Sequence, residues 1–119
     1  MSSLPVLTEI RDRGHFSELL GQNPGKIVIK FGAEWCAPCK AIEQQVHDWI
    51  EEMPETVQCM VIDIDECFDI YAFLKTKKMV NGIPAILCYN KGNVSYIPDD
   101  SVIGADAKKV DAFFQRCLE

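Results

Sequence analysis

The chain has 119 residues, of which 48% are apolar and 25% are charged, and its formal net charge is −6 at pH 7. This composition is ordinary for a soluble globular protein, and the length predicts one domain over residues 1–119. The negative charge argues against a surface for nucleic acid or for an anionic membrane. No apolar run approaches the roughly 20 residues that span a bilayer, and the N-terminus does not resemble a signal peptide, so a reducing, cytoplasmic setting is expected.

The first part of the chain predicts an edge strand, a helix and a buried strand. Residues 4–8 contain a proline, which an edge strand tolerates. Apolar residues at helical spacing indicate a helix that ends near Gly21, and a turn follows at residues 23–25. Residues 26–31 are too continuously apolar to have a solvated face, so they predict a central strand.

One long helix is predicted after residue 40, because its apolar residues lie at i, i+4, i+7, i+8 and i+11 and the stripe stops before Pro54. We interpret this stripe as core; its members are Ile42, Val46, Trp49, Ile50 and Met53. Residues 57–64 predict a second buried strand, and a shorter helix follows around residues 70–74.

The C-terminal part predicts a third apolar strand at residues 85–89, a hairpin turn at 90–93 and a strand at 94–97. Asp106 is the expected N-cap of a last helix. Its apolar face comprises Val110, Phe113, Phe114, Cys117 and Leu118. The order of the elements predicts an α/β fold with a central mixed sheet of four to five strands and helices on both faces.

The most informative stretch is residues 35–40, Trp-Cys-Ala-Pro-Cys-Lys, between the 26–31 strand and the long helix. Cys36 and Cys39 are three positions apart, within one helical turn, so they can close a small disulfide ring or stay open as a dithiol. The unpaired N–H groups and the dipole at a helix start favour a thiolate at Cys36. Cys36 is therefore the expected nucleophile, and Cys39 the resolving thiol.

A metal site is the main alternative for this cysteine pair. Zinc requires four ligands, and His15 and His47 are isolated from any second close pair, so no metal is expected. The acidic residues Asp63, Asp65 and Glu66 could also suggest a metal site. A solvated loop and a helix cap are the better interpretation of that cluster.

Four further cysteines lack an informative spacing. Cys59 and Cys88 fall in predicted strands, where a single cysteine usually acts as a small buried hydrophobe. Cys67 follows a strand and would be a regulatory thiol if it were exposed. For Cys67 and Cys117 both an inert and a reactive role stay open.

Three segments follow one another in an informative order: the 35–40 motif after Phe-Gly-Ala-Glu, Gly82-Ile83-Pro84 before a strand, and Gly104 ahead of the last helix. With these segments the chain resembles the thioredoxin family over nearly its whole length. The resemblance implies a thioredoxin fold and a cis peptide bond at Pro84, facing the dithiol. It also implies an apolar docking surface around Cys36, formed by Trp35, Ala37, Pro38, Ile83, Pro84 and Gly104.

The chain departs from the family pattern beside the motif. Thioredoxins usually carry a buried aspartate five residues before the tryptophan, where this chain has Lys30, and Val61 stands where an accompanying lysine is common. In the family that acid is thought to help the resolving cysteine lose its proton. A charged Lys30 would lower the pKa of a nearby thiol, a desolvated Lys30 would accept a proton, and a Lys30 that reaches solvent would do neither. Gln44 replaces a proline that often kinks the long helix.

The expected function is reduction of protein disulfides, in which Cys36 attacks a client and Cys39 resolves the mixed disulfide. The resemblance implies a monomer active in electron transport and cell redox homeostasis, with an NADPH-dependent thioredoxin reductase as electron donor. No bound cofactor is expected beyond the Cys36–Cys39 disulfide. The alternative is a thioredoxin-fold binding or adaptor module with incidental thiols, which the missing acid favours. An oxidase or isomerase would act at another potential and in another compartment.

Overall fold

The computed structural model describes residues 4–119 and contains one sheet of four strands in the order β2-β1-β3-β4. The strands are β1 (Lys26–Gly32), β2 (Val57–Asp63), β3 (Ala85–Asn90) and β4 (Asp100–Ile103). The β1 and β2 strands are parallel, whereas β1 pairs with β3, and β3 with β4, in antiparallel fashion. This mixed sheet confirms the predicted fold class. Its four strands match the lower of the two expected strand numbers.

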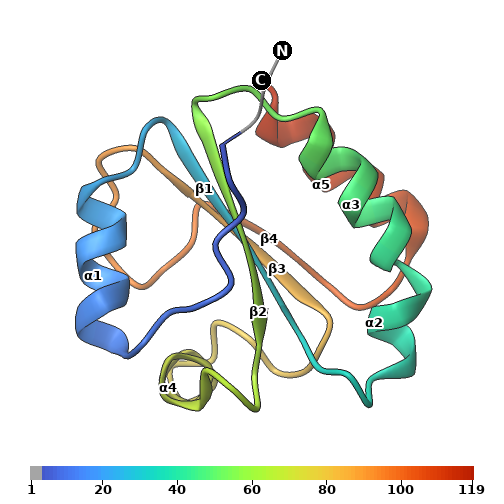
Figure 1. Cartoon of the computed structure of the whole chain (residues 1–119), viewed down its shortest axis with the longest axis horizontal. Helices are drawn as coiled ribbons and strands as arrows, with labels where there is room; N and C mark the ends of the chain where they lie inside the picture. Colours follow the sequence, from blue (N-terminus) through green and yellow to red (C-terminus); the bar gives the residue numbers. More distant parts are fainter. Residues whose placement is uncertain (1–3) are drawn as a thin grey trace.

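The helices are α1 (Arg13–Gly21), α2 (Ala37–Ala41), α3 (Glu43–Glu51), α4 (Phe68–Thr76) and α5 (Ala107–Cys117). Figure 1 shows α1 and α4 on one side of the sheet and α3 and α5 on the other. None of these helices, within residues 4–119, is long and apolar enough to cross a bilayer.

The structure has a hydrophobic core on each face of the sheet. Successive side chains of β1 lie in different cores, because neighbouring residues of a strand point to opposite faces. Ile27 and Ile29 pack with the buried residues of α1 and α4. Val28 packs with those of α3 and α5. Lys30 is two residues beyond Val28, so the alternation places it on the α3 and α5 face, at the end of the strand that leads into the cysteine motif.

The prediction of one long helix is wrong, since the chain leaves helical geometry at Ile42, with φ −109° and ψ 7°. Ile42 is β-branched, which restricts its side chain in a helix, and it is buried against the sheet. The break lies two residues before Gln44 and involves no proline. The apolar stripe nevertheless continues past the break, because Val46, Ile50 and Met53 are also buried. Trp49 is only partly buried, but it packs against the same core.

The predicted edge strand at residues 4–8 is reduced to an isolated bridge between Leu7 and Met60 of β2. The Leu7 N–H donates to the carbonyl of Cys59 at 3.2 Å, and the Val61 N–H donates to the carbonyl of Leu7 at 2.9 Å. Pro5, two residues earlier, has no N–H with which to extend a ladder. The segment therefore lies at the predicted edge without forming a full strand.

The predicted strand at residues 94–97 is wrong, and β4 begins later, at Asp100. The Asn93 side chain donates to the Ile97 carbonyl and to the Asp99 carboxylate, each at 2.9 Å. An asparagine that bonds nearby backbone offers the chain an alternative to ladder pairing. The intervening residues therefore form a loop stabilised by side chains, and β4 supplies the expected antiparallel partner of β3.

The last helix begins as predicted, with Asp106 as its N-cap. The Asp106 carboxylate accepts hydrogen bonds from the backbone N–H groups of Lys108 and Lys109, at 3.0 and 3.3 Å. The expected apolar face is buried except at Leu118, which is exposed. Leu118 lies beyond the helical residues, which end at Cys117, so it leaves the buried face.

Candidate active site

The loop after β1 and the first turn of α2 hold the two motif cysteines. Cys36 is the N-cap of α2, and Cys39 lies inside the helix. The two residues form a disulfide, with their Cα atoms 5.2 Å apart. Pro38 occupies the first turn, where a missing N–H breaks no intrahelical bond and a fixed φ favours the helix. Of the two states that the spacing allows, this structure has the closed disulfide ring.

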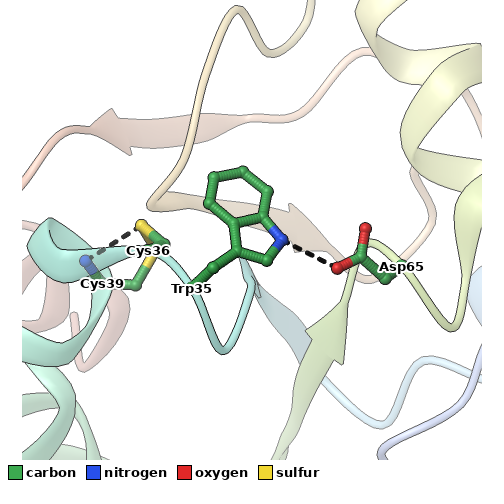
Figure 2. Close-up of a disulfide and its surroundings, with 4 residues drawn as sticks. All are labelled: Trp35, Cys36, Cys39 and Asp65. Atoms are coloured by element: carbon green, nitrogen blue, oxygen red, sulfur yellow. Dashed lines mark hydrogen bonds between the residues drawn. A yellow bond between two sulfur atoms is a disulfide. The ribbon is translucent and has the colours of Figure 1, made fainter.

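The sulfur of Cys36 accepts a hydrogen bond from the backbone N–H of Cys39, at 3.1 Å (Figure 2). A donor that points at this sulfur favours the thiolate once the disulfide is reduced. Both cysteines expose only 4% of their surface. Among the side chains beside the ring, those of Trp35, Ala37 and Pro38 are exposed.

Trp35 is 68% exposed, yet its ring has a fixed partner. Its indole N–H donates to the Asp65 carboxylate at 2.8 Å, as Figure 2 shows. Asp65 follows β2, the parallel neighbour of β1, so the two loops leave the sheet at the same edge. The sequence interpretation missed this role and treated Asp65 as loop. An acidic residue directly after a second parallel strand is the feature that could have indicated it.

The acidic cluster of Asp63, Asp65 and Glu66 begins at the last residue of β2. Among residues 4–119, no three His, Cys, Asp or Glu side chains are grouped so that they could hold a metal ion. The Asp63 carboxylate accepts a hydrogen bond from the Asp65 backbone N–H at 2.7 Å, which shapes the loop instead.

The Ile83-Pro84 segment lies next to the cysteine loop. Phe31 pairs with Ala85 across β1 and β3, so the start of the cysteine loop and Pro84 meet at the same end of the sheet. The Ile83–Pro84 peptide bond is cis. Within residues 4–119, the backbone N–H and carbonyl of Ile83 form no hydrogen bond.

Gly104 reaches the same end of the sheet from β4. Its backbone N–H donates to the Pro84 carbonyl at 2.8 Å. Its φ is +97°, in the left-handed region that favours glycine. The topology thus brings Pro84 and Gly104 to the edge from which the cysteine loop leaves.

Lys30 is buried, with 8% of its surface exposed. A Cβ placed on Gly32 would lie 3.4 Å from the Cys39 sulfur and 4.0 Å from the Lys30 Cε, so both side chains border the space that this glycine leaves open. They also line one cleft of about 300 Å³, together with Glu43 and Val61. Burial lowers the pKa of Lys30, and the negative charge of Glu43 opposes that shift.

Comparison with known proteins shows similarity to thioredoxins, which agrees with the cysteine pair at the start of α2. The thioredoxin family model matches residues 7–116. The chain is 30% identical to thioredoxin of Equus caballus over 108 residues, which cover 90% of this chain and 94% of that protein. It is 29% identical to thioredoxin of Mycoplasma pneumoniae over 103 residues, which cover 82% of this chain and 95% of that protein.

Solved structures agree with these relatives. Oxidized mitochondrial thioredoxin 3 of Saccharomyces cerevisiae superposes with a TM-score of 0.72 at 26% identity, over 92% of this chain and 94% of that one. Thioredoxin of Malassezia sympodialis gives a TM-score of 0.70 at 27% identity, over 95% and 94%. With its Cys36–Cys39 pair at the helix start, this chain belongs to the thioredoxin family and is a protein dithiol–disulfide oxidoreductase.

Proposed function

We propose that this chain reduces disulfides of client proteins in two exchange steps. The Cys36 thiolate attacks one client sulfur, which forms a mixed disulfide and releases the other client sulfur as a thiolate. Cys39 then attacks the Cys36 sulfur, which frees the client and closes the Cys36–Cys39 disulfide, so that two electrons pass to the client. The observation that carries the proposal is the hydrogen bond from the Cys39 N–H to the Cys36 sulfur, which favours the attacking ion.

The proposed docking surface consists of Trp35, Ala37, Pro38, Ile83, Pro84 and Gly104. Its support is the meeting of the Pro84 and Gly104 segments at the end of β1 and the lack of a hydrogen bond at the Ile83 backbone within residues 4–119. An extended client segment would pair with those backbone groups beside the Cys36 sulfur. Backbone pairing carries little sequence information, so broad client acceptance follows.

We also propose that Lys30 takes up the proton of Cys39 during the second step. Cys39 must lose its proton to attack, and a neutral Lys30 amine is the proposed acceptor in the shared cleft. Burial favours the neutral amine, because it disfavours the charged form. Lys30 would thereby serve where the family uses a buried acid.

The spent disulfide requires an outside donor of two electrons. The proposed donor is a thioredoxin reductase that draws on NADPH, since the chain is a thioredoxin family member. The proposed setting is the cytoplasm, where the chain would act in electron transport as a single-domain monomer without a bound cofactor. Its net charge of −6 supports protein clients over nucleic acid or an anionic membrane.

Covalent trapping tests the proposal. A Cys39→Ser variant cannot resolve the mixed disulfide, so clients should accumulate on Cys36 and be released by reductant. The control is Cys36→Ser/Cys39→Ser, which should recover none of them. Equal, reductant-insensitive recovery by both variants would contradict the proposal and favour an adaptor that binds partners without turnover.

A further inference from the structure

A surface groove runs along α4, and we call it the α4 groove. It consists of three hollows, and neighbouring hollows share lining residues: Ala72 and Thr76 belong to two of them, and so do Arg13 and Phe73. Its walls come from α4, from α1, which Figure 1 shows on the same side of the sheet, and from the loop after β3. The groove is separate from the cleft that contains Lys30 and Cys39.

Aromatic rings line the α4 groove. Phe73 of α4 packs edge-on against Tyr96 of the loop after β3, with ring centroids 5.6 Å apart. Phe68 lines the first of the three hollows and exposes 68% of its surface, and Val94 lines the last hollow and exposes 65%. Large exposed apolar side chains gathered at one concave surface are typical of a binding site.

Two lysines hold their charges over these rings. The Lys77 Nζ lies 5.6 Å from the ring centroid of Tyr96 and 5.9 Å from that of Phe73. The Lys75 Nζ lies 6.0 Å from the ring centroid of Tyr71. A cation–π contact positions an ammonium group without neutralising its charge. Within residues 4–119 neither lysine forms a salt bridge, so both charges remain uncompensated.

The charge of the α4 groove is opposite to that of the whole chain. The chain has 18 acidic residues and a net charge of −6, yet none of the described residues that line the three hollows is Asp or Glu. Arg13 also lines the groove, but Asp69 already pairs with it at 3.0 Å. Lys75 and Lys77 are therefore the cations available to a ligand, and charge complementarity favours a ligand with carboxylates.

A short peptide fits this surface better than a long polyanion does. The α4 helix has nine residues and is roughly 13 Å long, which about four residues of an extended peptide span. A nucleic acid would continue beyond the groove and meet the acidic remainder of the chain, which repels it. A peptide can also carry the apolar side chains that would cover Phe68 and Val94.

We propose that the α4 groove docks a short acidic segment of a client protein. Carboxylates of the segment pair with Lys75 and Lys77, and its apolar side chains cover Phe68 and Val94. Phe68 follows Asp65 by three residues, and Asp65 holds Trp35 beside Cys36, so the groove leads away from the active-site loop. That the segment belongs to a client rests on the proposed function, whereas the binding itself does not.

Fluorescence anisotropy tests the binding. The probe is a fluorescein-labelled peptide of Glu-Glu-Leu repeats, added to the oxidised chain so that no turnover intervenes. It should bind, and the same peptide with glutamine in place of glutamate should bind more weakly. Added salt should weaken binding of the acidic probe, because it screens exposed charges. The proposal is overturned if the unaltered chain does not bind the acidic probe, or binds a single-stranded oligonucleotide equally well.

Two double variants with the same change in charge locate the site. Lys75→Gln/Lys77→Gln should raise the Kd of the acidic probe about twofold to thirtyfold, the range that two exposed ion pairs give. Lys108→Gln/Lys109→Gln alters two exposed lysines of α5, on the other side of the sheet, and should leave the Kd unchanged. Equal effects of the two variants would overturn the proposal, because net charge alone would then govern binding.

The thermal stability of the same variants separates docking from a structural role. Cations near the C-terminal end of a helix stabilise it through the helix dipole, and Lys75 and Lys77 lie at that end of α4. A lower Tm of Lys75→Gln/Lys77→Gln with an unchanged Kd would assign the two lysines to helix stability alone and overturn the proposal. A raised Kd with an unchanged Tm is the expected result.

Reduction kinetics connect the groove to the active site. Two disulfide-bonded peptides are compared that differ only in a Glu-Glu-Leu or a Gln-Gln-Leu tail. The acidic tail should lower the KM, and Lys75→Gln/Lys77→Gln should cancel this difference without changing kcat. Equal KM values in the unaltered chain would show that the groove does not recruit clients. If neither peptide were reduced, the proposed function would fail instead, and anisotropy would still decide whether the groove binds.

Discussion

Asp65 accepts a hydrogen bond from the indole N–H of Trp35 at 2.8 Å, although the two residues are 30 positions apart in the chain. The contact joins the loop after β1 to the loop after β2. It holds an aromatic ring that is 68% exposed, directly beside Cys36. An ordered ring loses less conformational freedom when a client covers it.

Asp65→Ala should therefore raise the KM for a protein disulfide. The loss of one net hydrogen bond is worth about 0.5–1.5 kcal/mol, so the expected increase is about twofold to tenfold, with little change in kcat. Steady-state reduction of insulin measures both constants. Asp65→Asn keeps an oxygen acceptor and is the control; equal effects of the two variants would show that the bond does not order Trp35.

Lys30→Met should stabilise the folded chain at neutral pH. Burial lowers the pKa of Lys30 from its ordinary 10.5, so between the two values the unfolded chain binds more protons, and stability rises with pH. The advantage of Lys30→Met should thus be largest below the folded pKa and should shrink as the pH approaches 10.5. Urea unfolding at several pH values measures this difference. The exposed Lys91→Met should lack the trend.

The pH dependence of disulfide reduction tests Lys30 as proton acceptor. Below its lowered pKa the amine is protonated and cannot take the proton of Cys39, so release of client from the mixed disulfide should slow as the pH falls through that value. Lys30→Asp should follow a different profile, because a carboxylate accepts a proton down to acidic pH. Single-turnover release from a preformed mixed disulfide measures the step. Identical profiles would remove Lys30 from the mechanism.

Gly32→Ala should be tolerated, and Gly25→Ala should not. The new Cβ at Gly32 meets the Cys39 sulfur at 3.4 Å, which is ordinary contact, whereas a Cβ at Gly25 meets the Thr56 carbonyl oxygen at 2.6 Å. Gly32→Ala should change the free energy of unfolding by less than about 1 kcal/mol, and Gly25→Ala should lower it by more. Denaturant titration compares the two. A large loss in Gly32→Ala would show that the space beside Cys39 must stay empty.

Much of the fold follows from local patterns. The continuous apolar runs located β1 to β3, and Asp106 located the start of α5, because a carboxylate at an N-cap bonds only nearby backbone. The errors lie where side chains compete with regular structure. The periodicity of apolar residues does not detect the break at Ile42, since the buried stripe continues through it.

The candidate site likewise contains residues that the sequence predicts and residues that it does not. The disulfide pair Cys36 and Cys39 could be predicted from the spacing of the two residues, which brings the sulfurs together. The role of Asp65 could not be predicted, because it depends on β2 lying next to β1. Contacts within one turn were thus predictable, whereas those between distant elements required the structure.

The non-helical residue at Ile42 has a mechanical consequence. Cys36 caps a five-residue helix that contains Cys39, and this helix is separate from α3, whose buried side chains belong to the core. When the ring opens and closes, the displacement of sulfur atoms can be absorbed within this short segment. The scaffold behind it can then remain rigid through every catalytic cycle.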